Sequence, residues 1–599
     1  MFTLSIVDSA IIFIYFCFVI SVGFFFRKKA SRNLFSFFTA DKNYGWIWIG
    51  TSMVATTFSA DTPLAIAGIT ANKGISGNWF WWSWILTYMT ITIFYSKLWW
   101  RSKIITDVEF TEIRYSGKEA TYLRFIKAFY FSILLNGIIL GWVFLSIQKI
   151  ITPFILPDYE IQWFKSIYPK FLLVGDYNLS FILLLLLVIV VLYSGLSGVR
   201  GGVFNDMFQF IIGMGGSIFF AYYTVESIGG PIELKNKIMQ IYPEKHQEIL
   251  SLFPNWKEMG YIILIYFSIQ WWAQYYSDGT GYLVQRLNTA KSEKDAQLGS
   301  LWFNFANFAL RTWPWVFIGL AGLVIYPQTP EACKNHLLIC NDRELVYPIL
   351  IKELLPAGLK GFLLTGLIAA FMSTVETHLN WGASYIANDF YKRYIKPNST
   401  EKEQIIVSKL GVLIMAVIGI IFANQMKTIA GAWKFLIAIA AGIGFPQMIR
   451  WFWWRANAYT EISGMVASLV LTVVLYSLYD TNKIPDEYLL FFIATFSGII
   501  SLVATLITKP VDQNKLIEFA NRVKPYGFWK PIMKENKIQP LLRDLFLWFL
   551  GNISILSFML SIAYWIFRDY HLFLWFFFVF LLTGIPVILA LIKRESDEV

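Results

Sequence analysis

Charged residues are scarce in this sequence. Only 15% of its 599 residues are Asp, Glu, Lys or Arg, while 57% are hydrophobic. So little charge cannot cover the surface of a soluble protein of this size. Windows of about 20 apolar residues recur along the chain, and each is long enough to cross the hydrocarbon core of a membrane. The composition therefore excludes a soluble protein and indicates an all-α polytopic membrane protein.

Histidine and cysteine are also scarce, with four and three residues. The sequence has no metal-ligand cluster, P-loop or nucleophile motif, so we do not expect an enzyme. The net charge of +11 does not indicate nucleic-acid binding, because the basic residues lie mostly in short loops beside apolar spans. Cys333 and Cys340 flank a short loop, where either a disulfide or two free thiols are compatible with the sequence.

The hydropathy pattern predicts about fifteen spans, near residues 7–26, 46–70, 79–99, 123–150, 179–195, 202–225, 259–282, 298–326, 358–385, 408–425, 429–452, 460–478, 488–507, 543–567 and 570–592. If the spans alternate, one side of the membrane receives most of the basic loops, at 27–32, 101–118, 286–294, 392–396, 450–455, 509–537 and 593–594. That side is predicted to be cytoplasmic, with the N-terminus outside and the C-terminus inside.

Two spans are interrupted near mid-membrane depth. The second contains Thr56, Thr57, Ser59, Asp61, Thr62 and Pro63, and the seventh contains the polar and glycine-rich run 277–281. A proline or glycine kink explains either break alone. Two breaks five spans apart instead favour an inverted-repeat transporter, in which broken helices form the binding site.

The ninth span carries hydroxyl groups on one face. Ala370, Ser373, Thr374 and Thr377 are spaced i, i+3, i+4, i+7. Hard oxygen ligands without thiolate or imidazole suit an alkali ion, although packing through small residues explains the same pattern. Glu376 lies in this span too, and a carboxylate at that depth needs a cavity, an ion or a partner.

Five stretches resemble the sodium:solute symporter family, which includes bacterial sodium/galactose, sodium/proline and sodium/sialic acid symporters. They are FFTADKNYGWIWIGTSMVATTFSADTPLAIAG (37–68), YSGLSGVRGGVFNDMFQ (193–209), YLVQRLNTAKSEKDAQ (282–297), LIAAFMSTVETHLNWGASYIANDFYKRY (367–394) and RWFWWRANAYTEISGM (450–465).

The resemblance implies a leucine-transporter-type fold of two inverted five-helix repeats. The expected organisation is an extra helix and cytoplasmic loop (1–45), the first repeat (46–226), the second repeat (227–455), two peripheral helices (456–507), a surface-lying cytoplasmic linker (508–542) and two extra C-terminal helices with a tail (543–599).

The resemblance also implies a sodium site. Its ligands would be carbonyls of Ala55, Phe58 and Ala370 and hydroxyls of Ser373 and Thr374. Some relatives hold a second sodium ion, which maps here to Asp206, Ser373, Glu376 and Thr377, with Glu376 replacing a hydroxyl. Either a second cation binds there, or Glu376 is a proton carrier or stays protonated, or it hydrogen-bonds a neighbouring helix or faces the cytoplasmic vestibule.

The family's solute cavity maps to several polar and aromatic positions, namely Asp61, Thr62, Asn78, Trp79, Gln274, Asp278, Tyr282, Asn307 and Gln447. Sugar-transporting relatives place a glutamate near Trp79 and a lysine near Asn307; both charges are absent here, which argues against a hexose. Sugars, nucleosides or a solute with an amino group fit the remaining pattern.

The expected function is sodium-coupled import of a small polar organic solute by alternating access, with one or two Na+ ions, across a bacterial inner membrane. The expected partners are the solute and the lipid bilayer. A proton-coupled carrier that uses Glu376 and Asp206, or a membrane solute sensor, remains an alternative.

Overall fold

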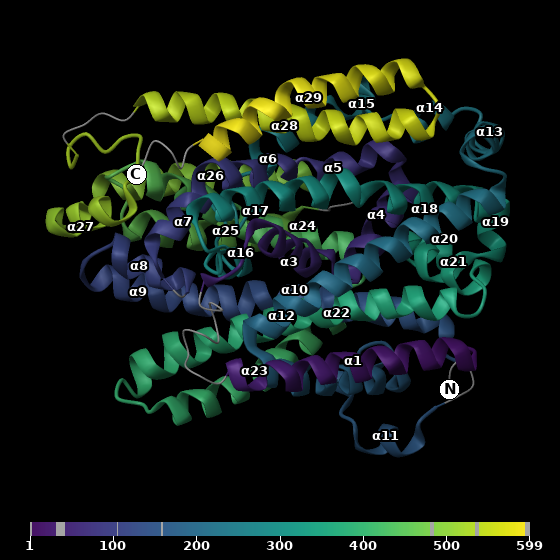
Figure 1. Ribbon diagram of the computed structural model, residues 1–599, viewed down its shortest axis with the longest axis horizontal. Coiled ribbons are helices and arrows are strands. Elements are labelled where there is room, and N and C mark those ends of the chain that lie inside the picture. The colour runs from purple at the N-terminus through teal and green to yellow at the C-terminus, as the bar shows by residue number, and fades with distance from the viewer. Residues whose placement is uncertain are drawn as a thin grey trace.

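The computed structural model describes residues 3–593, apart from 31–41, 105, 157–159, 480–483 and 534–537. Some of the basic loop residues, among them Arg32, Lys537 and Arg594, lie outside the described residues. The described residues form helices joined by turns and irregular segments, with no strand among them. Most helices run along the long axis of the molecule, and α1 begins at the end opposite to the one where α29 finishes (Figure 1).

Eleven helices in the described part are long and apolar enough to cross a membrane. Two shorter apolar segments, Tyr177–Leu192 and Gly260–Gln270, match the fifth and seventh predicted spans. The second and third predicted spans are each divided into shorter helices, which explains why they fall below the length of a continuous span.

The first half of the chain contains α1 (Ile6–Ala30), α3 (Trp46–Phe58), α4 (Asp61–Lys73), η2 (Ile75–Asn78), α5 (Trp79–Trp82), α6 (Trp84–Thr90), η3 (Ile91–Tyr95), α7 (Ser96–Ser102), η4 (Asp107–Glu109), α8 (Phe110–Arg114), α9 (Gly117–Phe129), η5 (Tyr130–Leu135), α10 (Asn136–Ile151), α11 (Gln162–Ile167), α12 (Tyr177–Ile228), α13 (Pro231–Ile241) and α14 (His246–Leu250).

The second half contains α15 (Trp256–Ile265), η8 (Tyr266–Gln270), α16 (Tyr282–Leu287), α17 (Glu293–Phe305), η9 (Ala306–Leu310), α18 (Thr312–Ile325), α19 (Pro330–Asn335), α20 (Leu337–Asn341), η10 (Arg343–Leu345), α21 (Val346–Leu354), α22 (Leu359–Ser384), η11 (Tyr385–Ile395), α23 (Glu401–Gln425), α24 (Ile429–Phe452), α25 (Ala458–Leu478), α26 (Asp486–Ile507), α27 (Gln513–Val523), α28 (Ile538–Ile566) and α29 (Tyr570–Lys593).

The element α12 covers two predicted spans. It forms one helical element from Tyr177 to Ile228, but the contacts of its two ends show that its first and last parts run in opposite directions. At one end, Gly175 lies against Gln148 at the end of α10. Towards the other end, Phe220 packs on Tyr347 of α21, and α21 also contacts the turn η6 (Thr152–Phe154) that follows α10. Both ends of α12 therefore lie on the same side of the molecule, as two antiparallel spans require.

The break in the second span is confirmed, and it lies just before Pro63. α3 ends at Phe58, and Ser59 has a φ of 41°, which a helix cannot accommodate. α4 begins at Asp61, so Pro63 occupies its first turn, where no intrahelical bond from its nitrogen is needed. The polar residues therefore lie at a helix C-terminus that faces a helix N-terminus.

The break in the seventh span is longer than the sequence predicts. Helical structure stops at Gln270 and resumes at Tyr282. Gly279 and Gly281 have φ values of 92° and 90°, a conformation that favours glycine over other residues. This irregular segment carries Asp278 through the middle of the molecule.

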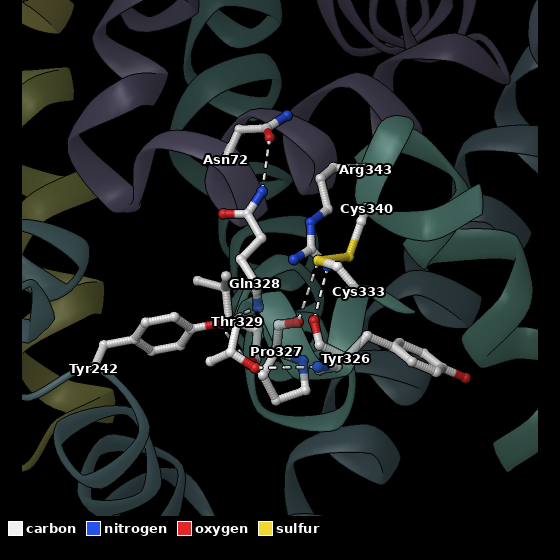
Figure 2. Close-up of a disulfide and its surroundings, with 11 residues drawn as sticks. Asn72, Tyr242, Tyr326, Pro327, Gln328, Thr329, Cys333, Cys340 and Arg343 are labelled. Carbon is white, nitrogen blue, oxygen red and sulfur yellow. Dashed lines mark hydrogen bonds between the residues drawn. A yellow bond between two sulfur atoms is a disulfide. The ribbon is translucent and has the colours of Figure 1, made fainter. Parts of the chain in front are cut away.

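A disulfide joins Cys333 to Cys340, which settles the alternative left open by the sequence. Around it, Gln328 donates to Asn72 at the end of α4, and Arg343 donates to the carbonyl of Tyr326 (Figure 2). The loop therefore joins the second half of the broken helix to the segment that leads into α21.

The linker after α26 lies against the protein with one face buried and the other exposed. Phe519, Tyr526 and Trp529 are buried. The indole of Trp529 donates to the carbonyl of Trp451 at the end of α24. The following helices, α28 and α29, pair with one another and cover one side of the molecule (Figure 1).

Candidate functional site

The hydroxyl face of α22 lies against the end of α3. Thr374 Oγ1 is 2.9 Å from the carbonyl oxygen of Thr56 and 3.1 Å from that of Ala370. The other members of the predicted sodium set, Ala55, Phe58 and Ser373, are buried as well. The structure thus brings neutral oxygens from a broken helix next to hydroxyls from a neighbouring helix.

Ser373 is oriented towards α12. Its hydroxyl donates to Asp206 Oδ1 at 2.7 Å, and the hydroxyl of Ser52 donates to Asp206 Oδ2 at 2.5 Å. Ser52 was not predicted as a site residue. It adds a hydroxyl from α3 to the carboxylate, so α3, α12 and α22 meet at Asp206.

Arg286 lies where a second cation was predicted. Its guanidinium is 3.6 Å from Asp206 and donates to Thr377 Oγ1 at 3.1 Å. The carboxylate of Glu376 lies beside Gly202 on α12 and is also buried. The predicted residues therefore do converge, but a positively charged side chain of the protein is placed among them.

A cavity lies between the two helix breaks. Five of the predicted solute residues line it: Asp61, Thr62, Gln274, Tyr282 and Asn307. Its walls are largely aromatic, with Trp81, Trp84, Tyr88, Trp142, Tyr275, Tyr276 and Trp433. Thr56 and Thr374 line it too, so the cavity adjoins the hydroxyl face of α22.

Several polar atoms in the cavity wall lack hydrogen-bond partners among the described residues. They include Asp61 Oδ1, Gln274 Oε1, Trp84 Nε1 and the hydroxyls of Thr56 and Ser59. All five side chains line the cavity. Buried polar groups without partners are costly, so such a cluster indicates the position of a polar ligand or of water.

The cavity contains one charge of each sign. Arg311 lines it together with Asp61, and the two side chains attract one another. Arg311 follows the π-helical turn η9 and donates to the carbonyls of Asn307, Val54 and Thr57. It therefore satisfies carbonyls freed by the break after α3. Sequence reasoning missed Arg311, although an arginine inside an apolar span is itself a signal.

The other four predicted solute residues do not line the cavity. Asn78 donates to Thr70 and to the carbonyl of Ile75. The indole of Trp79 donates to the carbonyl of Leu252. Gln447 accepts from Ser277, and Asp278 is bonded elsewhere. The sequence did not predict the direction of these four side chains.

Asp278 forms part of a buried charge network instead. Its Oδ2 accepts from Arg450 Nη2 at 2.5 Å and from the indole of Trp451 at 2.7 Å. Arg450 also contacts Glu461, and Glu461 pairs with Lys127. The network links the second break to α24, α25 and α9. Because its charges are balanced within the protein, we do not assign it to the solute.

Comparisons with known proteins agree with this architecture. The model of the sodium:solute symporter family matches residues 171–468. The chain is 24% identical over 506 residues to a sodium/glucose cotransporter of Vibrio parahaemolyticus, covering 81% of this chain and 88% of the relative. It is 23% identical over 555 residues to sodium/myo-inositol cotransporter 2 of Oryctolagus cuniculus, covering 85% and 78%.

A solved structure shares the fold. It is a Na+-coupled sialic acid symporter in a substrate-bound, outward-open state, with a TM-score of 0.65 at 18% identity. The match covers 85% of this chain and 99% of that structure. The predicted inverted-repeat, leucine-transporter-type fold is therefore confirmed.

Proposed function

Because this chain belongs to the sodium:solute symporter family and acts as a sodium-coupled membrane transporter rather than an enzyme, we propose that it imports a neutral polyhydroxylated solute together with one Na+ ion. The observation that carries the proposal is the cluster of unpartnered polar atoms in the cavity wall, with Asp61 Oδ1 and Gln274 Oε1 as acceptors. Hydroxyl groups of a solute would donate to both and accept from the indole of Trp84.

The charges of the cavity support a neutral solute. Asp61 is balanced by Arg311, so a solute with a net charge would leave one charge uncompensated. Three bonds from Arg311 already go to backbone carbonyls, so it is poorly placed to bind the carboxylate of an amino acid. Aromatic walls suit the apolar faces of a sugar or cyclitol ring.

The relatives named for glucose and myo-inositol transport support the same solute class. However, sugar-transporting relatives place a lysine near Asn307, which lines the cavity without such a charge here, so a hexose would meet a different set of groups. The cavity is small, about 100 Å³. We therefore favour a single-ring cyclitol or sugar derivative over an oligosaccharide or a nucleotide.

The proposed sodium ion binds between α3 and α22. Carbonyls of Ala55, Phe58 and Ala370 and the hydroxyls of Ser373 and Thr374 would be its ligands. Thr374 currently donates to the carbonyl of Thr56, so a small rotation would turn its oxygen lone pairs towards an ion. Sodium would then hold α3 against α22 and fix the break that borders the solute cavity.

A single coupled ion is the proposed stoichiometry. Arg286 already supplies a positive charge to Asp206 and Thr377, so a second Na+ there would be repelled. Two hydroxyl donors and the guanidinium contact Asp206, so its carboxylate is already engaged within the protein. One ion contributes roughly 2.3 kcal/mol per 100 mV of membrane potential, before its concentration gradient is counted.

Transport would proceed by alternating access, with one bundle rocking against the other around the two breaks. The proposed orientation places the N-terminus outside and the C-terminus in the cytoplasm of a bacterial inner membrane. In that orientation the network of Asp278, Arg450 and Glu461 closes the cytoplasmic side.

Uptake by purified protein in liposomes tests the proposal. Radiolabelled cyclitols, sugars, nucleosides and amino acids would be compared under an inward gradient of Na+, of K+ or of protons. We expect uptake of one polyhydroxylated solute with Na+ alone. Uptake of an amino acid but no polyol would contradict the solute class, and uptake driven by protons without Na+ would contradict the coupling ion.

A further inference from the structure

A buried imidazole, that of His378, forms part of the wall of the solute cavity. His378 lies on α22, one helical turn after Thr374, and only 3% of it is exposed. An imidazole inside an apolar span is costly unless its two ring nitrogens find hydrogen-bond partners. The partner of one nitrogen therefore shows what the other nitrogen can do.

The nitrogen Nδ1 of His378 faces Asn136 of α10, with 2.6 Å between Nδ1 and Asn136 Oδ1. The amide nitrogen of Asn136 donates to the backbone carbonyl of His378 at 2.8 Å. A carbonyl oxygen can only accept, so this second bond fixes the orientation of the Asn136 amide. Its Oδ1 faces the ring and also only accepts, which places the proton of the neutral imidazole on Nδ1.

Both side chains of this pair are held in place by their surroundings. Asn136 is fully buried, and a Cβ placed on Gly382 of α22 would lie 2.8 Å from its amide nitrogen. The imidazole ring lies between Tyr282 and Trp381, whose ring centroids are 5.6 and 5.8 Å from its own. Neither side chain can turn without displacing a neighbour, so the packing maintains the tautomer with the proton on Nδ1.

The nitrogen Nε2 of His378 is consequently an acceptor. Asn136 lies outside the cavity lining, so Nδ1 points away from the cavity and Nε2, on the other side of the ring, points towards it. No hydrogen bond reaches Nε2 from the part of the protein that the structure describes. Asp61 Oδ1 and Gln274 Oε1 are acceptors of the same cavity wall. Three acceptors require an occupant that offers several hydrogen-bond donors.

We propose that His378 binds the solute, with Nε2 accepting a hydrogen bond from one of its hydroxyl groups, and that Asn136 is a positioning residue that keeps the proton on Nδ1. This inference rests on the proposed function, because it requires a polyhydroxylated solute in the cavity. An ether or carbonyl oxygen at the same place would face the lone pair of Nε2 with no hydrogen between them. His378 therefore selects for a free hydroxyl at one position of the solute ring.

The position of His378 also connects the solute to the ion. Thr374, a proposed sodium ligand, lies one turn earlier on the same helix. A solute bonded to His378 and an ion bonded to Thr374 would stabilise the same segment of α22. Each should therefore raise the affinity for the other by the same factor, because the coupling of two binding equilibria is reciprocal.

Nitrogen-15 NMR of protein labelled in its four histidines tests the tautomer without any solute. The signal that disappears in His378→Asn identifies the residue. We expect a protonated Nδ1 and an unprotonated Nε2 in the unmodified protein, and a shift towards the other tautomer in Asn136→Ala. A proton on Nε2 in the unmodified protein would overturn the proposal.

Binding of myo-inositol, a cyclitol with a hydroxyl on every ring carbon, tests the contact by calorimetry in saturating sodium. His378→Asn keeps a donor for Asn136 but places no acceptor at the position of Nε2, so affinity should fall at least tenfold. His378→Gln brings an amide oxygen near that position and should recover most of the loss. His246→Asn is the matched control, because Nδ1 of His246 also bonds to a carbonyl, that of Pro243, but outside the cavity.

Deoxy analogues of myo-inositol identify the hydroxyl. One analogue should bind the unmodified protein about as weakly as myo-inositol binds His378→Asn, and it should lose no further affinity in that variant. The factor by which myo-inositol raises sodium affinity should also fall towards 1 in His378→Asn. Should this variant fail to fold, Asn136→Ala, which keeps the ring but frees its proton, should weaken binding several-fold.

Two different failures are distinguishable. If the unmodified protein binds myo-inositol and His378→Asn binds it equally well, or if every deoxy analogue loses further affinity in that variant, the role of His378 is overturned and the proposed symport stands. If the unmodified protein binds neither myo-inositol nor any other polyol, the proposed solute class fails, and the role of His378 fails with it. Sodium-dependent stabilisation should persist in both His378 variants and shows that they are folded.

Discussion

The guanidinium of Arg286 lies 3.6 Å from the carboxylate of Asp206, with both side chains buried beside the hydroxyl face of α22. Relatives with a second sodium ion would place that ion near this carboxylate. Here the positive charge is covalently part of the protein, and it does not leave during a transport cycle.

Removing that charge should expose its role. Arg286→Gln leaves Asp206 buried without a compensating cation, which typically costs about 3–5 kcal/mol. We expect a lower melting temperature that high sodium partly restores, because an ion can then occupy the vacated position. The Hill coefficient for sodium should rise from about 1 towards about 2. The double variant Asp206→Asn/Arg286→Gln should recover stability without this sodium effect. A Hill coefficient of about 2 in the unmodified protein would contradict the single-ion proposal.

The proposed sodium site makes a separate prediction. Ser373→Ala/Thr374→Ala removes two of five oxygen ligands, so sodium should no longer stabilise the protein against heat. An ion at 100 times its dissociation constant contributes about 2.7 kcal/mol, and this gain should vanish. Thr365→Ala is the matched control, because Thr365 lies on the same helix and, within the part of the chain that the structure describes, its hydroxyl bonds to the carbonyl of Gly361. Stabilisation by Na+ over K+ that survives in the double variant would rule the site out.

The number and position of the spans could be predicted from the sequence, because the thickness of the bilayer sets the length of a spanning helix. All fifteen predicted spans have a counterpart, although α12 carries two of them and the breaks divide two others. Pro63, Gly279 and Gly281 predicted the breaks, because proline lacks a backbone N–H and glycine readily adopts a positive φ.

Side-chain partners were less predictable. Arg286 and Arg450 come from basic stretches assigned to cytoplasmic loops, yet both are buried and paired with aspartates. A charge count cannot distinguish a loop arginine from one that folds back into the core. Asp278 and Asp61 both lie at helix breaks, but only Asp61 faces the cavity. That difference depends on partners 172 residues away along the chain.

Asp61 should be essential for solute binding. Asp61→Asn keeps the size of the side chain but removes the charged acceptor, and hydrogen bonds to charged groups contribute about 1.5–3 kcal/mol. Affinity for the solute should fall by one to two orders of magnitude while sodium-dependent stabilisation is retained. Asn78→Ala provides a comparison at a polar position outside the cavity. Solute affinity that is unchanged in Asp61→Asn would remove the basis of the proposed binding mode.

The disulfide should stabilise the loop that joins α4 to α21. Opening the Cys333–Cys340 ring of eight residues releases chain entropy worth about 2.5 kcal/mol in the simplest estimate. Cys333→Ser/Cys340→Ser should therefore lower the melting temperature, and a reducing agent should do the same to the unmodified protein. Cys17→Ser should have no such effect, since this thiol is exposed and unpaired with another cysteine. Equal melting temperatures with and without reductant would contradict a stabilising role.

The contacts of Asp278 hold the second break against α24, and we predict that they keep one side of the cavity closed. Its carboxylate is held by Arg450 and Trp451 of α24, and Trp529 of the docked linker holds the carbonyl of Trp451 in turn. An opening towards the cytoplasm must separate the second break from α24 or move both together. Asp278→Asn keeps the shape but weakens charge-assisted bonds worth about 1.5–3 kcal/mol, enough to shift an open–closed ratio by roughly 10- to 150-fold.

The two native cysteines outside α1 form the disulfide, so Cys17→Ser/Thr62→Cys presents a single thiol in the cavity wall. An impermeant maleimide applied to inside-out vesicles should label this thiol faster when Asp278→Asn is added. Asp389→Asn is the control, because it breaks a buried pair with Arg124 that does not involve either break. If the control accelerates labelling equally, the effect is general loosening. If neither variant accelerates labelling, the bonds between Asp278 and Arg450 do not hold the cavity closed. Weakening bonds that did so would increase the fraction of open protein and therefore the labelling rate.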